Sequence, residues 1–239
     1  MTRLDKFLSD SGFGTRKHVK KLIRSKLVTV NGCIEDDSGF IFDPSKAKIE
    51  VDNKPVEYSD EIYLLMNKPE GYMCSTIDER YPSVLNLIDP GLRKRTRIVG
   101  RLDADTTGVL LLTSNGRLNN RLIHPNTEIE KEYEASLDHG LADEDLSKML
   151  SGPIDLGDNT YVTPVRIEKI EPYIIRIVVR EGKYHEIKRI FKKYGYSVIA
   201  LNRARLGFLT CADLKKGEVR DLSKEEIDRL RSITHMEGN

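Results

Sequence analysis

The chain has 239 residues, of which 38% are hydrophobic and 32% are charged. This length and composition indicate a soluble globular protein with one large or two modest domains and a real core. Apolar runs such as 62–66 are far too short to span a bilayer, and no signal-peptide segment opens the chain. Three widely spaced cysteines, Cys33, Cys74 and Cys211, form no CxxC pair or disulfide framework, which favours a reducing, cytoplasmic compartment.

The formal net charge of +1 conceals an uneven distribution of charge along the chain. Residues 1–26 hold eight Lys/Arg against two Asp, and residues 180–205 hold eight Lys/Arg against two Glu. Clustered cations on a near-neutral protein favour contact with a polyanion at two segments. No Gly-rich phosphate loop or dinucleotide fingerprint is present, so no nucleotide cofactor is expected.

The first fifty residues predict two helices followed by short strands. Apolar spacing predicts a helix over 2–10 with Thr2 as its N-cap, and a second helix that begins after Thr15. Residues 27–30 are typical of a strand, Asn31-Gly32 of a tight hairpin turn, and further strand is expected through Val51. The cations of the second helix are most simply a solvated face.

The sequence Gly-Arg-Leu-Asp-Ala-Asp-Thr-Thr-Gly at 100–108 lies between the β-branched run 97–99 and the apolar run 109–113. Two short buried strands therefore meet at a polar turn. In the simplest interpretation its Asp and Thr side chains cap backbone amides. Asp103 and Asp105 also allow a divalent-metal hydrolase site, but no His or acidic cluster nearby completes a ligand set.

Residues 52–61 form a polar, turn-rich linker, and the chain beyond it alternates strands with a few helices. Strands are expected at 62–66, 130–135, 161–170, 173–179 and around 198–207. Helices are expected around 118–123, at 141–152, after Glu181-Gly182 and at 224–231. This order predicts an α+β fold with a largely antiparallel mixed sheet flanked by helices.

The 100–108 string resembles the signature loop of the RsuA family of pseudouridine synthases. Three further motifs follow the family order, at 67–72, 180–191 and 198–207. The N-terminal pattern of residues 2–50 resembles the S4-type RNA-binding domain. The resemblance covers residues 2–231 and implies an S4-like domain at 1–58 and a catalytic domain at 59–239.

The resemblance also implies roles for individual residues. Asp103 is the catalytic carboxylate, Lys188 pairs with it, and Tyr133 is the active-site tyrosine, although a strand tyrosine is more often a core aromatic. His185-Glu186 replaces the usual His-Gln pair, which leaves the role of Glu186 open. The expected substrate- or RNA-binding residues are Arg101, Leu201, Lys68, Arg189, Arg16, Lys20, Lys21 and Arg24.

The implied activity is isomerisation of uridine to pseudouridine in ribosomal RNA, without cofactor or metal. Residues 71–76 resemble the family member that acts on small-subunit (16S) rRNA, whereas sister enzymes act on large-subunit (23S) rRNA. A non-catalytic rRNA-binding assembly factor is the alternative from another class. The expected partner is rRNA or an assembling ribosomal subunit, and the expected state is a cytoplasmic monomer.

Overall fold

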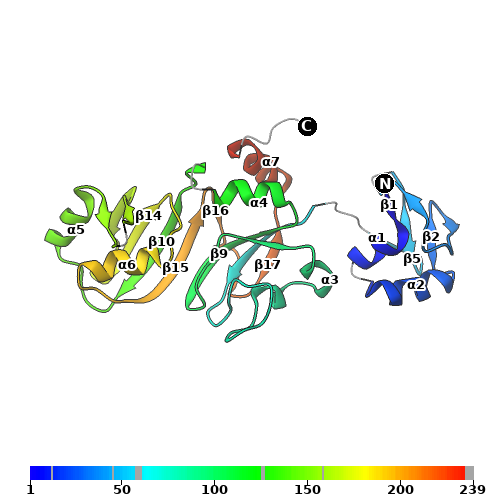
Figure 1. Cartoon of the computed structure of the whole chain (residues 1–239), viewed down its shortest axis with the longest axis horizontal. Coiled ribbons are helices and arrows are strands. Elements are labelled where there is room, and N and C mark those ends of the chain that lie inside the picture. Colours follow the sequence, from blue (N-terminus) through cyan, green and yellow to red (C-terminus); the bar gives the residue numbers. More distant parts are fainter. Residues whose placement is uncertain (12, 45, 57–60, 125–126, 158, 235–239) are drawn as a thin grey trace. The chain divides into compact units, whose positions relative to one another are not determined.

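The computed structural model describes residues 1–11, 13–44, 46–56, 61–124, 127–157 and 159–234 (Figure 1). The chain forms two compact units, Met1–Ile62 with Ile88–Thr96, and Tyr63–Leu87 with Arg97–Asn239. The domain boundary expected between residues 58 and 59 lies outside the described residues. In the part of the chain that is described, no helix combines the length and the apolar character needed to cross a membrane.

The first unit combines helices with short antiparallel strands. Its elements are β1 (Thr2–Arg3), α1 (Leu4–Asp10), α2 (Arg16–Arg24), β2 (Val28–Val30), β3 (Cys33–Ile34), β4 (Ile41–Phe42), β5 (Ile49–Val51), β6 (Lys54–Pro55) and α3 (Pro90–Arg93). One sheet has the order β3-β2-β5-β6, and β1 pairs with β4. Both helices and the hairpin predicted for this region are confirmed.

Local chemistry explains where these elements begin and turn. The Thr15 hydroxyl accepts a hydrogen bond from the backbone N–H of His18 at 3.3 Å, so Thr15 is the N-cap of α2, as predicted. Asn31 and Gly32 both have positive φ, as a type I′ hairpin turn requires. The N-cap predicted at Thr2 is wrong, because Thr2 pairs with Phe42 in β1 and the helix begins at Leu4.

The apolar face of α2 directs its cations outward. Val19 and Ile23 are buried in the core of the first unit, with Phe7 and Leu8 of α1. Because a helix presents residues three or four apart on one face, burying this stripe leaves the intervening positions in solvent. Exposed cations on α2 are Arg16, Lys17, Lys20, Lys21 and Arg24.

The second unit is built on a mixed sheet of order β13-β14-β10-β15-β9-β7-β17, with β8 paired to β9 and β16 to β15. Its strands are β7 (Tyr63–Lys68), β8 (Arg97–Val99), β9 (Thr106–Thr113), β10 (Lys131–Leu137), β13 (Arg166–Lys169), β14 (Ile174–Val179), β15 (Val198–Leu206), β16 (Leu209–Thr210) and β17 (Val219–Asp221). These pairings are antiparallel except for β9 with β15, which is parallel. The predicted largely antiparallel α+β fold is confirmed.

Helices cover the sheet in two groups (Figure 1). One core contains residues of β10, β14 and α6 (Glu186–Lys193) together with Met149 of α5 (Asp143–Leu150). The other contains residues of β7, β9, α4 (Gly116–Ile123) and α7 (Lys224–Ile233). A short 3-10 helix, η1, spans Val84–Leu87.

The single strand predicted over 161–170 is wrong. The chain forms β12 (Tyr161–Val162), which pairs with β11 (Ile154–Asp155), and then β13, which pairs with β14. Pro164 lies between them, and a proline has no N–H to donate to a strand partner, so the ladder is interrupted there.

Gly108 permits the parallel contact between β9 and β15. It has φ +105° and is aligned with Arg203. A Cβ at this position would lie 2.3 Å from the Arg203 carbonyl oxygen and 2.7 Å from Asn202 Oδ1. Any larger residue would therefore force the two strands apart and adopt a backbone conformation that L side chains rarely accept.

We predict that Gly108→Ala destabilises the protein by about 1–3 kcal/mol more than Gly195→Ala, because overpacking adds to backbone strain. Gly195 is the matched control, since it also has positive φ but has nothing within 4 Å of the added methyl group. Unfolding of both variants in urea measures the difference. Equal losses would show that β15 moves away from β9 at little cost.

Candidate active site

A buried lysine holds the polar loop between β8 and β9. Lys68 is fully buried, and its Nζ donates to the carbonyl oxygens of Thr106 (2.8 Å), Asp103 (3.0 Å), Pro69 (3.1 Å) and Ala104 (3.4 Å). The backbone N–H of Gly71 also donates to the Ala104 carbonyl at 2.8 Å. Because Lys68 and Gly71 bind the loop carbonyls, the loop backbone is fixed at Asp103.

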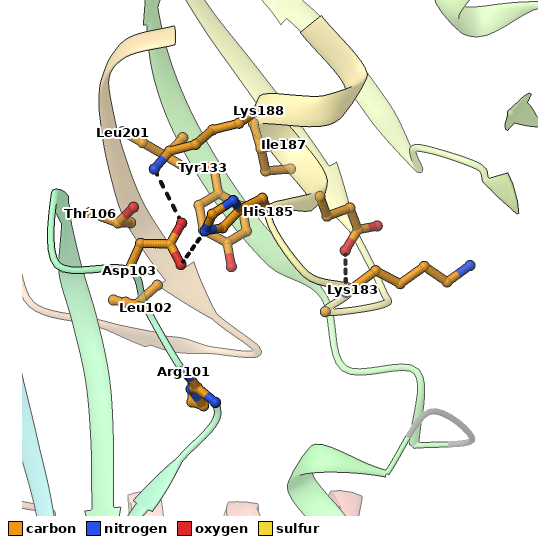
Figure 2. A pocket seen from close by; sticks show the side chains of 12 residues that line it. Arg101, Leu102, Asp103, Thr106, Tyr133, Lys183, His185, Ile187, Lys188 and Leu201 are labelled. Carbon is orange, nitrogen blue, oxygen red and sulfur yellow. Dashed lines mark hydrogen bonds and ion pairs between the residues drawn. The ribbon is translucent and has the colours of Figure 1, made fainter. Parts of the chain in front are cut away.

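The Asp103 carboxylate faces two side chains of the segment that leads into α6 (Figure 2). Its Oδ2 lies 3.1 Å from Lys188 Nζ, and its Oδ1 lies 3.3 Å from His185 Nε2. The Asp103 side chain is 34% exposed, so the carboxylate is fixed but still open to a ligand. The expected Asp103–Lys188 pair is present in the structure.

Lys188 also binds Asp105. The Lys188 Nζ–Asp105 Oδ1 distance is 2.6 Å, shorter than its distance to Asp103. Burial opposes the charged form of each group, yet the hydrogen bond between them holds the pKa of Asp105 below its usual value. Hydrogen bonds to Asp105 and Asp103 likewise outweigh burial and raise the pKa of Lys188. Asp105, which lies in the same turn as Asp103, is therefore a second partner of Lys188.

The sequence predicts no role for His185, although this residue lies within one of the family motifs. His185 has φ +49° at the N-cap of α6, and this conformation brings its ring to Asp103. The ring of Tyr184, which is largely exposed, stacks on it at a centroid distance of 3.8 Å. A positive φ at a non-glycine residue is not visible in the sequence, so no local signal identified this contact.

Neighbouring strands supply the walls of the cavity at Asp103 (Figure 2). Tyr133 of β10 and Leu201 of β15 are both buried and border it, with Arg101 on the loop. The cavity has a volume of about 70 Å³ and is lined by Arg101, Leu102, Asp103, Thr106, Tyr133, Gly182, Lys183, His185, Glu186, Ile187, Lys188 and Leu201. Asp103, Tyr133, Lys188, Leu201 and Arg101 are thus brought together.

The other expected binding residues lie elsewhere. Lys68 is too deeply buried to touch RNA and supports the loop instead. Arg189 does not line the cavity, and its Nη2 donates to the Leu156 carbonyl at 2.9 Å. The α2 residues Arg16, Lys20, Lys21 and Arg24 are exposed on the first unit.

Glu186, the departure from the family pattern, is buried at the cavity wall. Its Oε2 accepts a hydrogen bond from the backbone N–H of Lys183 at 3.0 Å, and burial raises the pKa of its carboxyl group. It therefore helps to shape the turn that leads into α6. No group of three or more His, Cys, Asp or Glu side chains suited to a metal ion is found among the described residues.

Lys68 makes a pH-dependent contribution to stability. Burial lowers its pKa from 10.5 to about 8, so between these values the unfolded chain binds more protons than the folded one. The unfolding free energy of the wild type should therefore rise relative to that of Lys68→Met as the pH increases from about 8 towards 10.5. Urea unfolding across this range measures the difference. No rise over this range would mean that the four carbonyl groups keep the ammonium charged, and Lys216→Met, at an exposed lysine, should differ from the wild type by an amount that does not change with pH.

Two family models match the N-terminal part and the following part of the chain separately. The model of the RNA pseudouridylate synthase family matches residues 62–193, and the model of the S4 domain matches residues 2–48. A solved crystal structure of a pseudouridylate synthase superposes with a TM-score of 0.67 and 30% identity, over 96% of this chain and 100% of the other.

Two named relatives extend over nearly the full length. Ribosomal small subunit pseudouridine synthase A of Yersinia pestis is 36% identical over 227 residues, 94% of this chain and 96% of the relative. A protein of Aquifex aeolicus named uncharacterized RNA pseudouridine synthase is 36% identical over 234 residues, 97% of each chain. The chain therefore belongs to the RNA pseudouridylate synthase family, with an S4 domain preceding the synthase domain.

Proposed function

We propose that this protein converts one uridine of small-subunit (16S) rRNA to pseudouridine, with Asp103 as the catalytic carboxylate. The observation that carries the proposal is the Asp103 carboxylate, held by Lys188 and His185 at a cavity walled by Tyr133 and Leu201. A binding protein has no need of a fixed carboxylate beside an aromatic wall, whereas an enzyme acting on an unstacked base does.

The reaction breaks the bond between the ribose and uracil N1, turns the base and forms a bond from the ribose to C5. Substrate and product are isomers, so no atom is added and no cofactor or metal is required. Asp103 acts either as a nucleophile on the ribose or as a base that begins elimination there. Both routes require its ionised form, which the Lys188 ammonium stabilises at 3.1 Å.

Other cavity residues then have distinct roles. The Tyr133 ring stacks on the extracted base, and its hydroxyl assists loss of the C5 proton. Leu201 contributes an apolar wall that helps to exclude water from the intermediate. Arg101, which is exposed at the cavity, contacts the RNA backbone beside the extracted nucleotide.

The small-subunit target is supported by the Yersinia pestis relative and by the resemblance of residues 71–76 to the small-subunit enzyme. The α2 cations of the first unit provide the second contact with structured RNA, chiefly through phosphates. The protein acts as a cytoplasmic monomer on rRNA or on an assembling subunit. A large-subunit target would keep the same chemistry and change only the RNA that is recognised.

The first experiment maps pseudouridine by carbodiimide labelling and primer extension on 16S and 23S rRNA, both naked and in ribosomal particles. The wild type should give one new stop in small-subunit rRNA, and Asp103→Asn should give none while its RNA affinity stays within a few fold. Asp105→Asn is the matched control, because it removes the same charge from the same loop and the same lysine. It should retain most of the activity.

Each other outcome identifies an alternative. Turnover by Asp103→Asn would remove Asp103 from the catalytic role, and a stop in 23S rRNA would change the target. No stop on any substrate would favour the binding factor. A metal-dependent hydrolase would instead cleave the RNA and be stopped by a chelator.

The basic face of α2 predicts a salt-dependent contribution to binding. Substituting Lys20, Lys21 and Arg24 together with Gln should weaken rRNA binding and reduce the slope of log K against log[salt] by about 2 if all three contact phosphates. Substituting Lys46, Lys48 and Lys54 with Gln removes the same charge from the same unit and should change the slope less. Equal slopes for both triple variants would show that α2 is an ordinary solvated face.

A further inference from the structure

A second and larger cavity adjoins the one at Asp103. Its volume is about 500 Å³, and Arg101 and Tyr133 border both cavities. All of its lining residues belong to the second unit. The reaction proposed for Asp103 gives this larger space no role, because that chemistry takes place at the smaller cavity.

Arg203 lines the larger cavity with a guanidinium group that is poorly satisfied. The side chain is 1% exposed, and its Nε donates to the Val109 carbonyl at 2.8 Å. Nη2 is buried without a hydrogen-bond partner, and among the described residues no carboxylate lies within ion-pair distance of Arg203. A buried arginine is normally paired, because a desolvated charge without a partner costs several kcal/mol.

Lys131 adds a second cation, for which the described part of the chain supplies no carboxylate partner. It borders the same cavity from β10, and its Nζ donates to the carbonyl oxygens of Arg180 (2.7 Å) and Ile129 (3.2 Å). Burial and the nearby charge of Arg203 lower its pKa. Two cations, the partly buried Lys131 and the fully buried Arg203, therefore line the larger cavity.

The carboxylates around this cavity are already paired with other groups. Glu128 lies 3.7 Å from Arg180, Glu181 lies 2.6 Å from Lys183, and Glu186 accepts the Lys183 backbone N–H. Within the described chain, Arg101, Lys131 and Arg203 have no carboxylate within 4 Å. The cavity thus has an unbalanced positive lining, which favours an anionic occupant.

The volume and the remaining lining indicate a nucleotide rather than an isolated ion. Val99, Leu122, Ile123 and Leu206 give the cavity an apolar wall. At Gly100 a Cβ would lie 3.8 Å from Arg203 Nη1, so the loop backbone passes close to the guanidinium. A phosphate beside cations and a base against apolar side chains together match these two surfaces.

We propose that this cavity holds a nucleotide adjacent to the target uridine in the RNA chain, with its phosphate bound by Arg203 and Lys131. The inference rests on the proposed function, since it assigns a second part of the same RNA substrate to the same domain. The enzyme thereby binds the RNA backbone next to the nucleotide that it extracts.

The test pairs a protein change with an RNA change. A 16S fragment is prepared with a neutral methylphosphonate in place of one phosphate at each linkage near the target uridine. With unmodified RNA, Lys131→Met should raise the dissociation constant roughly tenfold, as loss of a charged hydrogen bond does. With the fragment that is neutral at the bound linkage, wild type and Lys131→Met should bind equally.

Three further variants distinguish an effect of charge on RNA binding from an effect of altered structure. Lys216→Met removes an exposed lysine that lines neither cavity and should bind every fragment like the wild type. Thr163→Trp fills the larger cavity from an exposed position without changing its charge, and should weaken binding of unmodified RNA. Arg203→Lys, checked for folding by its urea midpoint, should lose affinity for the same single linkage.

The outcomes also separate this inference from the proposed function. If Lys131→Met weakens binding equally at every linkage, or not at all, the nucleotide site is wrong. If uridine 5′-monophosphate binds the wild type but not Lys131→Met while no RNA linkage is coupled to Lys131, the cavity takes a free nucleotide and the proposal is overturned. Failure of the wild type to make pseudouridine would contradict the proposed function, whereas the affinity comparison would still decide the role of the cavity.

Discussion

The parallel contact between β9 and β15 is the constraint on which the site depends. β9 begins at the end of the Asp103 loop, and β15 carries Leu201 and Arg203. Their alignment sets Leu201 opposite Thr106 and Arg203 opposite Gly108, and β15 in turn pairs with β10, which carries Tyr133. Because Gly108 lacks a Cβ, segments from residues 103, 133 and 201 converge on one cavity. The glycine that ends the loop motif is therefore required by packing as well as by turn geometry.

Two lysines hold this loop in different ways. The buried ammonium of Lys68 binds backbone carbonyls and fixes the loop backbone. Lys188 is shared by the carboxylates of Asp103 and Asp105, which compete for this single cation. The closer partner is Asp105, which draws part of the lysine's interaction away from Asp103. A ligand that displaces Asp105 would strengthen the Asp103–Lys188 pair at the moment when the carboxylate is needed.

The sequence was informative where local chemistry decides the outcome. Thr15 capped a helix, Asn31-Gly32 formed a hairpin, and the apolar runs around residues 100–108 became β8 and β9. The family resemblance correctly placed Asp103 next to Lys188, a pairing across 85 residues that no spacing rule predicts. The buried position of Lys68 and the left-handed His185 were missed, because burial and φ at one residue depend on the tertiary fold. Pro164 did carry a local signal, and it outweighed the β-rich composition of residues 161–170.

Arg203 shows why a buried charge without a carboxylate is informative. An arginine that served only the stability of the fold would be paired with a carboxylate. Even such a paired arginine can often be replaced by an apolar side chain at no cost to stability, or with a gain. The Val109 carbonyl satisfies Nε alone, and Nη2 has no partner among the residues that the structure describes. The carboxylates that border the cavity do not pair with Arg203, because they are bound by Arg180, Lys183 and a backbone amide. The phosphate of the proposed nucleotide supplies the hydrogen-bond partner that the described residues do not give to Nη2.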